Sequence, residues 1–408
     1  MAKRARPGSQ GALRAANEAR LVQALRSAPA TQSELAERTG LANATVSNIV
    51  RDLRERGAVS TSPTVRLGRR ASLVTLEQAG GPTVVGVDFG RQHVRIAIAV
   101  DGAGELVEDE IPLPPGHRAE ESIAAAVGRL DELLAAASLG RGDIAAICAG
   151  VPGPIDSRTG TVLGQTILPE WEGVAASDVA EAFGMPVELV NDADLGAIAE
   201  RAFGPHGQVD DLVFVKVGTG IGAGLVLGGR LHRSAIGIAG ELGHVQVEPN
   251  GALCVCGNRG CLETLASARA MAQSLSAALG TPITTADIVR RALDGDPATR
   301  RVIDDAGVAI GRAVATAASL LAPSLVVVGG PVAEVGDLLL GPVRESFRRF
   351  ALHPLTTTTR IERTTLGRRA EALGAVTLAG RSAVDDAFIG GPREARMRSM
   401  LDLNEVRA

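Results

Sequence analysis

The chain has 408 residues, of which 45% are hydrophobic and 22% charged, and this length suggests two or three folded domains. Its net charge of -4 is unevenly divided, because residues 1–80 carry 13 Lys or Arg against 6 Asp or Glu, whereas residues 81–408 carry 29 against 40. With one Trp, seven Phe and no Tyr, the chain lacks the aromatic platforms on which proteins usually stack single-stranded nucleic acid.

The division of charge indicates that only the N-terminal part meets a polyanion. A solvated basic face would carry the same charge, so both interpretations stay open on this feature alone. The basic start is not followed by an apolar stretch, and no run of about eighteen apolar residues occurs, so we expect neither a secretory signal nor a membrane span. Four cysteines are too few for a disulfide framework, and the cytoplasm is the expected compartment.

The first predicted elements are short helices. We expect residues 1–12 to form a flexible basic arm, and apolar residues at helical spacing predict a first helix over 13–27. Thr31 and Glu34 have the spacing of a capping box, which predicts a second helix that Gly40 ends.

A third helix and a hairpin complete this predicted domain. Residues 43–56 have an apolar face at helical spacing, which predicts the third helix. The alternating segment 58–76, broken by a Pro and a Gly, predicts a hairpin of two strands. The sequence therefore predicts an α+β winged helix-turn-helix over 13–77, followed by a linker over 78–82.

The third helix is the expected DNA-reading element, because the second helix of a helix-turn-helix enters the major groove with its N-terminal residues. Its polar face offers amide, hydroxyl and guanidinium groups suited to base edges and phosphates. The hairpin tip adds arginines that suit a minor groove or flanking phosphates. Any one of these residues is also typical of an ordinary solvated surface. The predicted DNA-binding residues are Asn43, Thr45, Ser47, Asn48, Arg51, Arg66, Arg69 and Arg70.

The remaining chain alternates apolar strand patterns with Ala-rich helix patterns, which is typical of parallel sheets covered on both sides. About 300 residues exceed one comfortable core, so we expect two lobes over 83–381 and a loosely held tail over 382–408. The predicted strands are Val84–Asp88, Val94–Val100, Ile144–Ala149, Val187–Val190, Leu212–Val217 and Leu325–Val328, with a helix over Ser122–Ala137.

A histidine and three closely spaced cysteines predict a metal site. One imidazole and three thiolates make a tetrahedral donor set that suits zinc, and four protein ligands leave no open position, so the predicted zinc is structural. The predicted ligands are His244, Cys254, Cys256 and Cys261. Cys148 stands alone in an apolar strand and is interpreted as a buried thiol.

Three glycine-rich turns follow predicted strands, at Asp88–Gly90, 217–224 and 328–331. Such turns can bring backbone N–H groups against phosphate, although each alone is also an ordinary turn. The same part of the chain contains side chains able to hydrogen-bond sugar hydroxyls, although any one carboxylate could equally be a solvated surface group. These are Asn191, Asp192, Glu241 and Glu263.

The segment G-E-L-G-H followed by C-V-C-G-N-R-G-C-L-E resembles the signature of the ROK family of repressors and sugar kinases. V-P-G-P-I-D at 151–156, N-D-A-D at 191–194 and G-R-R-A-E-A-L-G-A at 367–375 extend the likeness over about residues 83–380. The resemblance implies an actin-like sugar-kinase fold with two lobes and a sugar between them.

The resemblance also implies roles for individual residues. It makes Asn191, Asp192, Glu241, His244 and Glu263 sugar ligands, with Asp192 at the kinases' catalytic-base position and His244 bridging zinc and sugar. Two departures stand against it: the first loop has Arg91 where family kinases have the second Gly of Asp-x-Gly-Gly-Thr, and Ile167 replaces a sugar-contacting Asn.

Three functions follow as hypotheses. The preferred one is a homodimeric or homotetrameric regulator, expected to be a repressor, whose sugar or oligosaccharide effector changes its affinity for a palindromic DNA operator. The alternative is an ATP-dependent sugar kinase with an accessory DNA module, which Asp192 and the second glycine turn support and the first loop disfavours. A metal-dependent hydrolase fits poorly because the predicted zinc is fully coordinated by protein.

Overall fold

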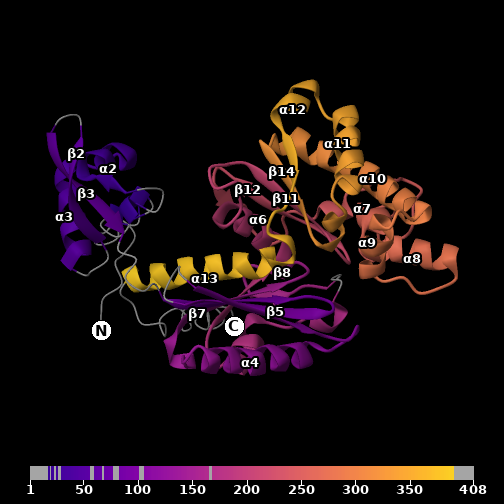
Figure 1. The fold of residues 1–408 in the computed structure, drawn as a ribbon, viewed down its shortest axis with the longest axis horizontal. Helices are drawn as coiled ribbons and strands as arrows, with labels where there is room; N and C mark the ends of the chain where they lie inside the picture. Colours follow the sequence, from indigo (N-terminus) through magenta and orange to yellow (C-terminus); the bar gives the residue numbers. More distant parts are fainter. Residues whose placement is uncertain are drawn as a thin grey trace, which may run out of the picture. The chain divides into compact units, whose positions relative to one another are not determined.

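The chain divides into two compact units, one built around residues 1–83 and the other around residues 84–380. Figure 1 shows their helices and strands. The computed structural model describes residues 17–18, 20–22, 24–25, 29–55, 59–66, 69–76, 82–100, 105–164 and 168–389.

The smaller unit packs helical segments on a three-stranded antiparallel sheet of order β1-β3-β2. Helix α2 (Gln32–Thr39) begins at Thr31, whose hydroxyl accepts from the backbone N–H of Glu34 while the Glu34 carboxylate accepts from the N–H of Thr31. Gly40 ends the helix with a φ of 69°, a conformation that favours glycine. The predicted capping box and stop are therefore confirmed.

Helix α3 spans Asn43–Glu55, and β2 (Val59–Arg66) pairs with β3 (Arg69–Leu76) as the predicted hairpin. A short strand β1 (Ala30–Thr31), which sequence patterns did not predict, pairs with β3. Of the predicted first helix, residues 17–18, 20–22 and 24–25 are described, and they are helical. The predicted arm 1–12 and all of the linker except Pro82 lie outside the described residues.

The larger unit contains two five-stranded sheets. The first has the order β10-β7-β4-β5-β6, with α4 (Ala119–Ala136) and α5 (Ala176–Phe183) packed together beside it (Figure 1). Its strands are β4 (Thr83–Phe89), β5 (His93–Val100), β6 (Glu105–Pro112), β7 (Ile144–Val151) and β10 (Val187–Asn191). The predicted strands are all present, although most extend one or two residues beyond the predicted ends, and β6 was not predicted.

The second sheet has the order β13-β12-β11-β14-β15, with β11, β14 and β15 parallel and β12 antiparallel to β11. Its strands are β11 (Leu212–Val217), β12 (Ile221–Leu227), β13 (Arg230–Leu231), β14 (Leu325–Gly329) and β15 (Arg360–Arg363). The helices of this lobe are α7 (Leu262–Ala266), α8 (Ala268–Leu279), α9 (Thr285–Leu293), α10 (Pro297–Leu321), α11 (Asp337–Phe350) and α12 (His353–Thr358). The smaller strand pair β8 (Ile155–Asp156) and β9 (Thr161–Val162) stands apart from both sheets.

Strand β11 contributes to a different core on each face, since successive side chains of a strand point to opposite sides. Val213, Val215 and Val217 pack with α10 and α11, whereas Leu212 and Phe214 pack with residues of α6 (Asp192–Ala202) and α13 (Ala370–Ile389). The same alternation places residue 216 on the α6 and α13 side.

Helices α6 and α13 lie close together, and both pack against strands of the sheets (Figure 1). A Cβ at Gly374 of α13 would lie 2.0 Å from the carbonyl oxygen of Leu195 in α6, and one at Gly86 of β4 would lie 2.4 Å from that of Ala372. Glycine at both positions therefore allows α13 to pack directly on its neighbours' backbones.

Helix α13 extends past residue 381, the predicted end of the larger domain, which itself adjoins the boundary of the larger unit at Gly380. It runs through Ile389, so residues 382–389 belong to a helix and not to a loosely held tail. The tail was expected because the segment is rich in charge and contains a Gly-Gly-Pro, but the helix continues through the first charged residues and ends just before the Gly390-Gly391-Pro392 triplet. Residues 390–408 lie outside the described part of the chain.

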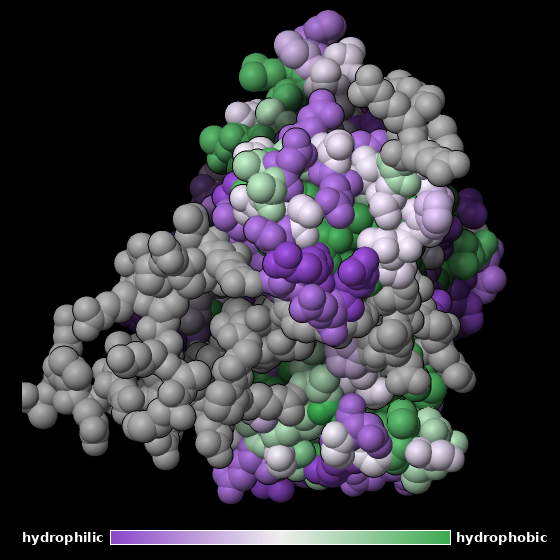
Figure 2. All heavy atoms as spheres, turned by 90° about the vertical axis from the view of Figure 1, so that its left-hand side faces the viewer, coloured by the Kyte–Doolittle hydropathy of each residue, from purple (hydrophilic) through white to green (hydrophobic). Residues whose placement is uncertain are grey.

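Most apolar side chains of the described residues are buried in these cores. On the face drawn in Figure 2, the coloured surface is mostly purple and white, and the green hydrophobic spheres lie in separate spots. Among the described residues, no helix combines the length and the apolar character needed to span a membrane.

Candidate functional site

Helix α3 presents a polar face opposite its buried one. Val46, Ile49, Val50 and Leu53 are buried in the core of the smaller unit. The exposed side chains at the remaining positions include Asn43, Ser47, Asn48 and Arg51, while Thr45 is half-buried. The helix can therefore offer amide, hydroxyl and guanidinium groups together to a groove.

The hairpin places arginines at its tip. Arg66 and Arg69 face each other as the last pair before the turn, and Arg70 pairs with Val65 in the next register position. The backbone thus brings the three predicted arginines to one end of the wing.

The four predicted metal ligands come together in the larger unit. One donor atom from each of His244, Cys254, Cys256 and Cys261 lies within 4.8 Å of the others. Nδ1 of His244 is 3.6 Å from Sγ of Cys254, and Sγ of Cys256 is 3.6 Å from Sγ of Cys261. Such separations fit donors about 2.0–2.3 Å from a shared tetrahedral ion, so the donor chemistry and spacing suit zinc.

Close backbone packing shapes this cluster. Gly260 has a φ of 65°, and a Cβ there would lie 1.5 Å from the carbonyl oxygen of Glu248. Only glycine fits both constraints, which lets the chain turn back and carry Cys261 toward Cys256.

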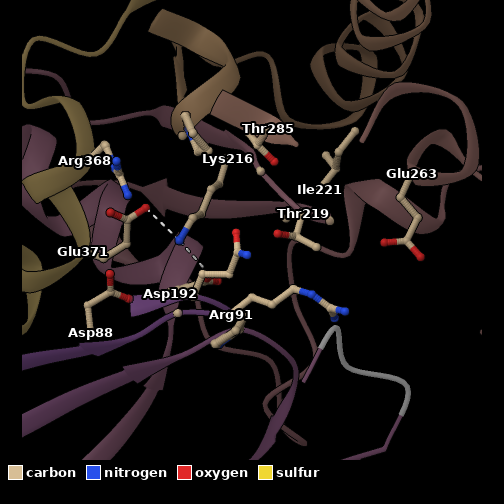
Figure 3. Close-up of a pocket in the computed structure, with 18 of the residues that line it drawn as sticks. Asp88, Arg91, Asp192, Lys216, Thr219, Ile221, Glu263, Thr285, Arg368 and Glu371 are labelled. Carbon is tan, nitrogen blue, oxygen red and sulfur yellow. Dashed lines mark hydrogen bonds and ion pairs between the residues drawn. The ribbon is translucent and has the colours of Figure 1, made fainter. Parts of the chain in front are cut away.

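A cavity of about 590 Å³ lies within the larger unit (Figure 3). All three predicted glycine turns reach it, through Gly90, Gly218–Gly220 and Gly330. It is also lined by every predicted sugar ligand, namely Asn191, Asp192, Glu241, His244 and Glu263. The sequence thus identified separate segments that the fold brings to one cavity.

Two of these polar residues are already engaged. Asn191 caps α6, with Oδ1 accepting from the N–H groups of Ala193 and Asp194, and its Nδ2 donates to the carbonyl of Gly153. Glu263, at the start of α7, lies 3.4 Å from Sγ of Cys254 and 3.5 Å from Arg269. Asn191 and Glu263 are therefore held in fixed orientations by the protein itself.

Glu241 and His244 connect the metal cluster to the cavity. His244 directs Nδ1 to Cys254, while its Nε2 lies 3.8 Å from a carboxylate oxygen of Glu241. Burial raises the pKa of Glu241, and the carboxylates of Asp192 and Glu263 add to that effect. The imidazole thus has one nitrogen toward the thiols and the other toward the polar wall of the cavity.

Lys216 contacts two carboxylates in the cavity wall. Its Nζ lies 2.8 Å from Oδ2 of Asp192 and 2.9 Å from Oε1 of Glu371, as the dashed lines in Figure 3 show. Burial alone would lower the pKa of Lys216, but Asp192, Glu371 and Asp88 raise it well above its usual 10.5. Lys216 therefore carries its charge in the interior.

A second group of charges surrounds Asp88. His93 Nε2 lies 2.9 Å from Oδ2 of Asp88, and Arg95 lies 3.8 Å from the same oxygen. The His93 ring also covers Gly90, since a Cβ there would lie 2.1 Å from its Cε1. The His93 ring thus occupies the space beside Gly90, whereas Arg91 lines the cavity and points away from Asp88 in Figure 3.

Sequence patterns missed Lys216, Glu371, His93 and Arg95. Lys216 left one signal, a lone cation in the apolar strand L-V-F-V-K-V. Glu371 lies in the 367–375 segment of the family resemblance, but nothing there indicated its contact with Lys216, because that partner lies in β11 and becomes a neighbour only in the folded chain. Ile167, the predicted replacement of a sugar-contacting Asn, lies outside the described residues.

Comparisons with known proteins add independent findings. Residues 84–382 match the family model described as the ROK family, and residues 14–70 match that of the MarR family. The xylose repressor of Caldicellulosiruptor bescii is 29% identical over 365 residues, which cover 85% of this chain and 91% of that protein.

Two solved structures share the fold. A ROK family transcriptional regulator, a homologue of the Escherichia coli MLC protein, has a TM-score of 0.76 and 27% identity over 93% of this chain and all of its own. A ROK family glucokinase from Streptomyces griseus, in complex with glucose and AMPPNP, has a TM-score of 0.63 and 30% identity over 73% of this chain and 99% of its own.

Proposed function

The chain belongs to the ROK family and carries a MarR-type winged helix-turn-helix at its N-terminus, and from this we propose that it is a sugar-responsive transcriptional repressor. The observation that carries the proposal is the pairing of an exposed polar α3 with a polar cavity in the same chain. The likeness to a xylose repressor, which covers 85% of this chain and 91% of that protein, supports it.

The proposed mechanism is a coupling between two binding events. The polar face of α3, from Asn43 to Arg51, reads the operator, and the arginines of the wing contact phosphates or the minor groove. A sugar binds Asn191, Asp192, Glu241, His244 and Glu263. Because a ligand shifts an equilibrium only by its differential affinity, the sugar must bind better to the arrangement that releases DNA.

The proposed assembly is a homodimer or homotetramer on a palindromic operator. Two winged modules then occupy half-sites separated by about 34–36 Å or a multiple of that distance.

The metal proposal is that His244, Cys254, Cys256 and Cys261 hold one structural zinc ion per chain. The zinc would fix the orientation of His244 through Nδ1, leaving Nε2 toward the cavity beside Glu241. Removing the metal would therefore disturb the sugar ligands as well as the fold of the segment.

The proposal is tested by selecting bound duplexes from a random pool and measuring their affinity by fluorescence anisotropy with and without mono- and oligosaccharides. Xylose and glucose belong in the panel because relatives are named for or bind them. We expect at least one sugar to raise the dissociation constant of the operator complex. Equal DNA affinity with every sugar shown to bind would overturn the coupling.

A sugar kinase is the second candidate, because Asp192 lines the cavity and glucokinases share the fold. A base at Asp192 would have to accept a proton from the attacking hydroxyl. Both of its carboxylate oxygens are engaged, Oδ1 by the N–H of Ala193 and Oδ2 by Lys216. A coupled ADP-release assay over the same sugars decides: turnover that Asp192→Ala abolishes would establish the kinase.

A further inference from the structure

The ammonium group of Lys216 lies among three buried carboxylates. The side chains of Asp88, Asp192 and Glu371 are 1%, 11% and 5% exposed, and that of Lys216 is 16% exposed. Lys216 contacts Asp192 and Glu371 directly and interacts electrostatically with Asp88. In Figure 3 the four side chains converge on one end of the cavity.

Each carboxylate comes from a different element. Asp88 is in β4 of the first sheet, Asp192 begins α6, and Glu371 lies in the first turn of α13. Lys216 reaches them from the second sheet because the alternation along β11 turns it to the same side as Phe214. The cation thus stands where both sheets and both connecting helices meet.

The three carboxylates need positive charge nearby to be buried stably. Burying a carboxylate without a partner is costly, and three buried carboxylates repel one another. Oδ1 of Asp88 is fully buried and has no hydrogen-bond partner within the described part of the chain, so this wall retains acceptor capacity beyond what Lys216, His93 and Arg95 use. Clustered carboxylate oxygens are the donor set that hard divalent cations such as Mg²⁺ and Mn²⁺ prefer.

We propose that the Lys216 ammonium takes the place of a divalent cation among Asp88, Asp192 and Glu371, so that this end of the cavity is neutralised without a metal–nucleotide complex. The inference rests on these contacts and not on the proposed sugar or DNA ligands. Lys216 is therefore a specificity-determining residue that makes a metal nucleotide unnecessary here. Its permanent positive charge stands where the metal ion of a bound nucleotide would otherwise neutralise the carboxylates.

The proposal predicts that removing the ammonium creates a metal site. Lys216→Met keeps a side chain of similar length but removes the ammonium that contacts Asp192 and Glu371, while Asp88 keeps His93 and Arg95. Mn²⁺ is the probe, since it prefers oxygen ligands over the thiolates of the Cys-rich segment and is detected by electron paramagnetic resonance. We expect Lys216→Met to bind about one Mn²⁺ per chain, at least tenfold more tightly than the wild type. Mn²⁺ should also raise its melting temperature.

Two control variants separate this site from nonspecific binding. Lys216→Arg retains the positive charge and should bind Mn²⁺ no better than the wild type. The double variant Lys216→Met/Glu371→Gln removes one carboxylate with the lysine, leaves less uncompensated charge for folding, and should lose the acquired site. Zinc content is measured in every sample, so that Mn²⁺ in the Cys-rich segment is recognised.

The outcomes are decisive in both directions. Tight Mn²⁺ binding that appears in Lys216→Met and disappears in the double variant supports the proposal. If Lys216→Met folds only with Mn²⁺ present, that dependence supports it too. Equal Mn²⁺ affinity in wild type and Lys216→Met overturns it, as does a double variant that binds Mn²⁺ as tightly as Lys216→Met.

Discussion

The imidazole Nε2 of His93 lies 2.9 Å from Oδ2 of Asp88, inside the first of the three glycine turns. The same ring, from the first residue of β5, covers Gly90 and occupies the space beside the turn. Asp88 is thereby held between a histidine, Arg95 and the more distant Lys216. This arrangement makes the stability of the larger unit sensitive to the charge of Asp88.

The first prediction concerns acid. Burial would raise the pKa of Asp88, but Lys216, His93 and Arg95 lower it from 3.8 to about 2. Because the folded pKa is the lower one, ionised Asp88 contributes stability above about pH 4, which is lost as the pH falls toward 2. Between pH 5 and pH 3 the free energy of unfolding, measured with urea, should therefore fall more steeply in the wild type than in Asp88→Asn.

The difference between these two proteins should be about 1–2 kcal/mol over that interval. Asp304→Asn, at an exposed carboxylate of α10, is the matched control and should follow the wild type. Acid also releases metals from thiolates, but it does so in all three proteins. Parallel curves for wild type and Asp88→Asn would contradict the assigned role of the Asp88 charge.

The second prediction concerns DNA. Arg51 of α3 has a side chain that is 57% exposed, and Arg69 stands beside the wing turn. Arg51→Ala should weaken operator binding about tenfold, since one contact to a base is worth about 1–3 kcal/mol. Arg69→Ala should also weaken it, through the loss of a contact to a phosphate or the minor groove. Sugar binding, measured by calorimetry, should stay unchanged.

Arg301→Ala removes the same charge from an exposed position of α10 in the larger unit. It should leave operator affinity within twofold of the wild type. A loss of affinity equal to that of Arg51→Ala would show that overall charge, rather than the winged unit, governs DNA binding.

The third prediction concerns the metal. Cys256→Ser removes one of the four clustered donors, so the purified variant should contain less than half of the wild-type zinc by elemental analysis. It should also lose its DNA response to sugar, because His244 belongs both to the cluster and to the cavity.

Cys148→Ser is the control, since Cys148 is buried in β7 and outside the cluster. It should keep its zinc. Full zinc occupancy in Cys256→Ser would refute the ligand assignment.

The fourth prediction concerns the sugar. Glu241 lines the cavity and caps no helix through its side chain, so Glu241→Gln changes its hydrogen bonding with little effect on the fold. If the Glu241 carboxylate accepts hydrogen bonds from sugar hydroxyls, replacing it with an amide should cost about 1–3 kcal/mol of binding free energy. Sugar affinity should therefore fall roughly tenfold or more. Operator affinity without sugar should not change.

Glu345→Gln, on the exposed face of α11, makes the same chemical change away from the cavity. Its sugar affinity should equal that of the wild type, as measured by calorimetry. Unchanged sugar binding in Glu241→Gln would place the sugar elsewhere.

The local features of this chain were readable because neighbours in sequence create them. The capping box of Thr31 and Glu34 joins groups three residues apart, and the hairpin between β2 and β3 follows from alternation around a short turn. Cys254, Cys256 and Cys261 lie within one short segment, so their spacing alone predicted that their donor atoms would cluster.

Tertiary structure alone decided how charges meet in the cavity. Lys216 and Glu371 belong to distant segments, and their contact depends on the packing of α13 against the second sheet. Residues 382–389, expected to belong to a loose tail, continue α13 instead, because a helix can carry charged residues until a glycine or proline stops it. Periodicity and spacing report what a segment does by itself, whereas a buried ion pair exists only once the surrounding elements have excluded water.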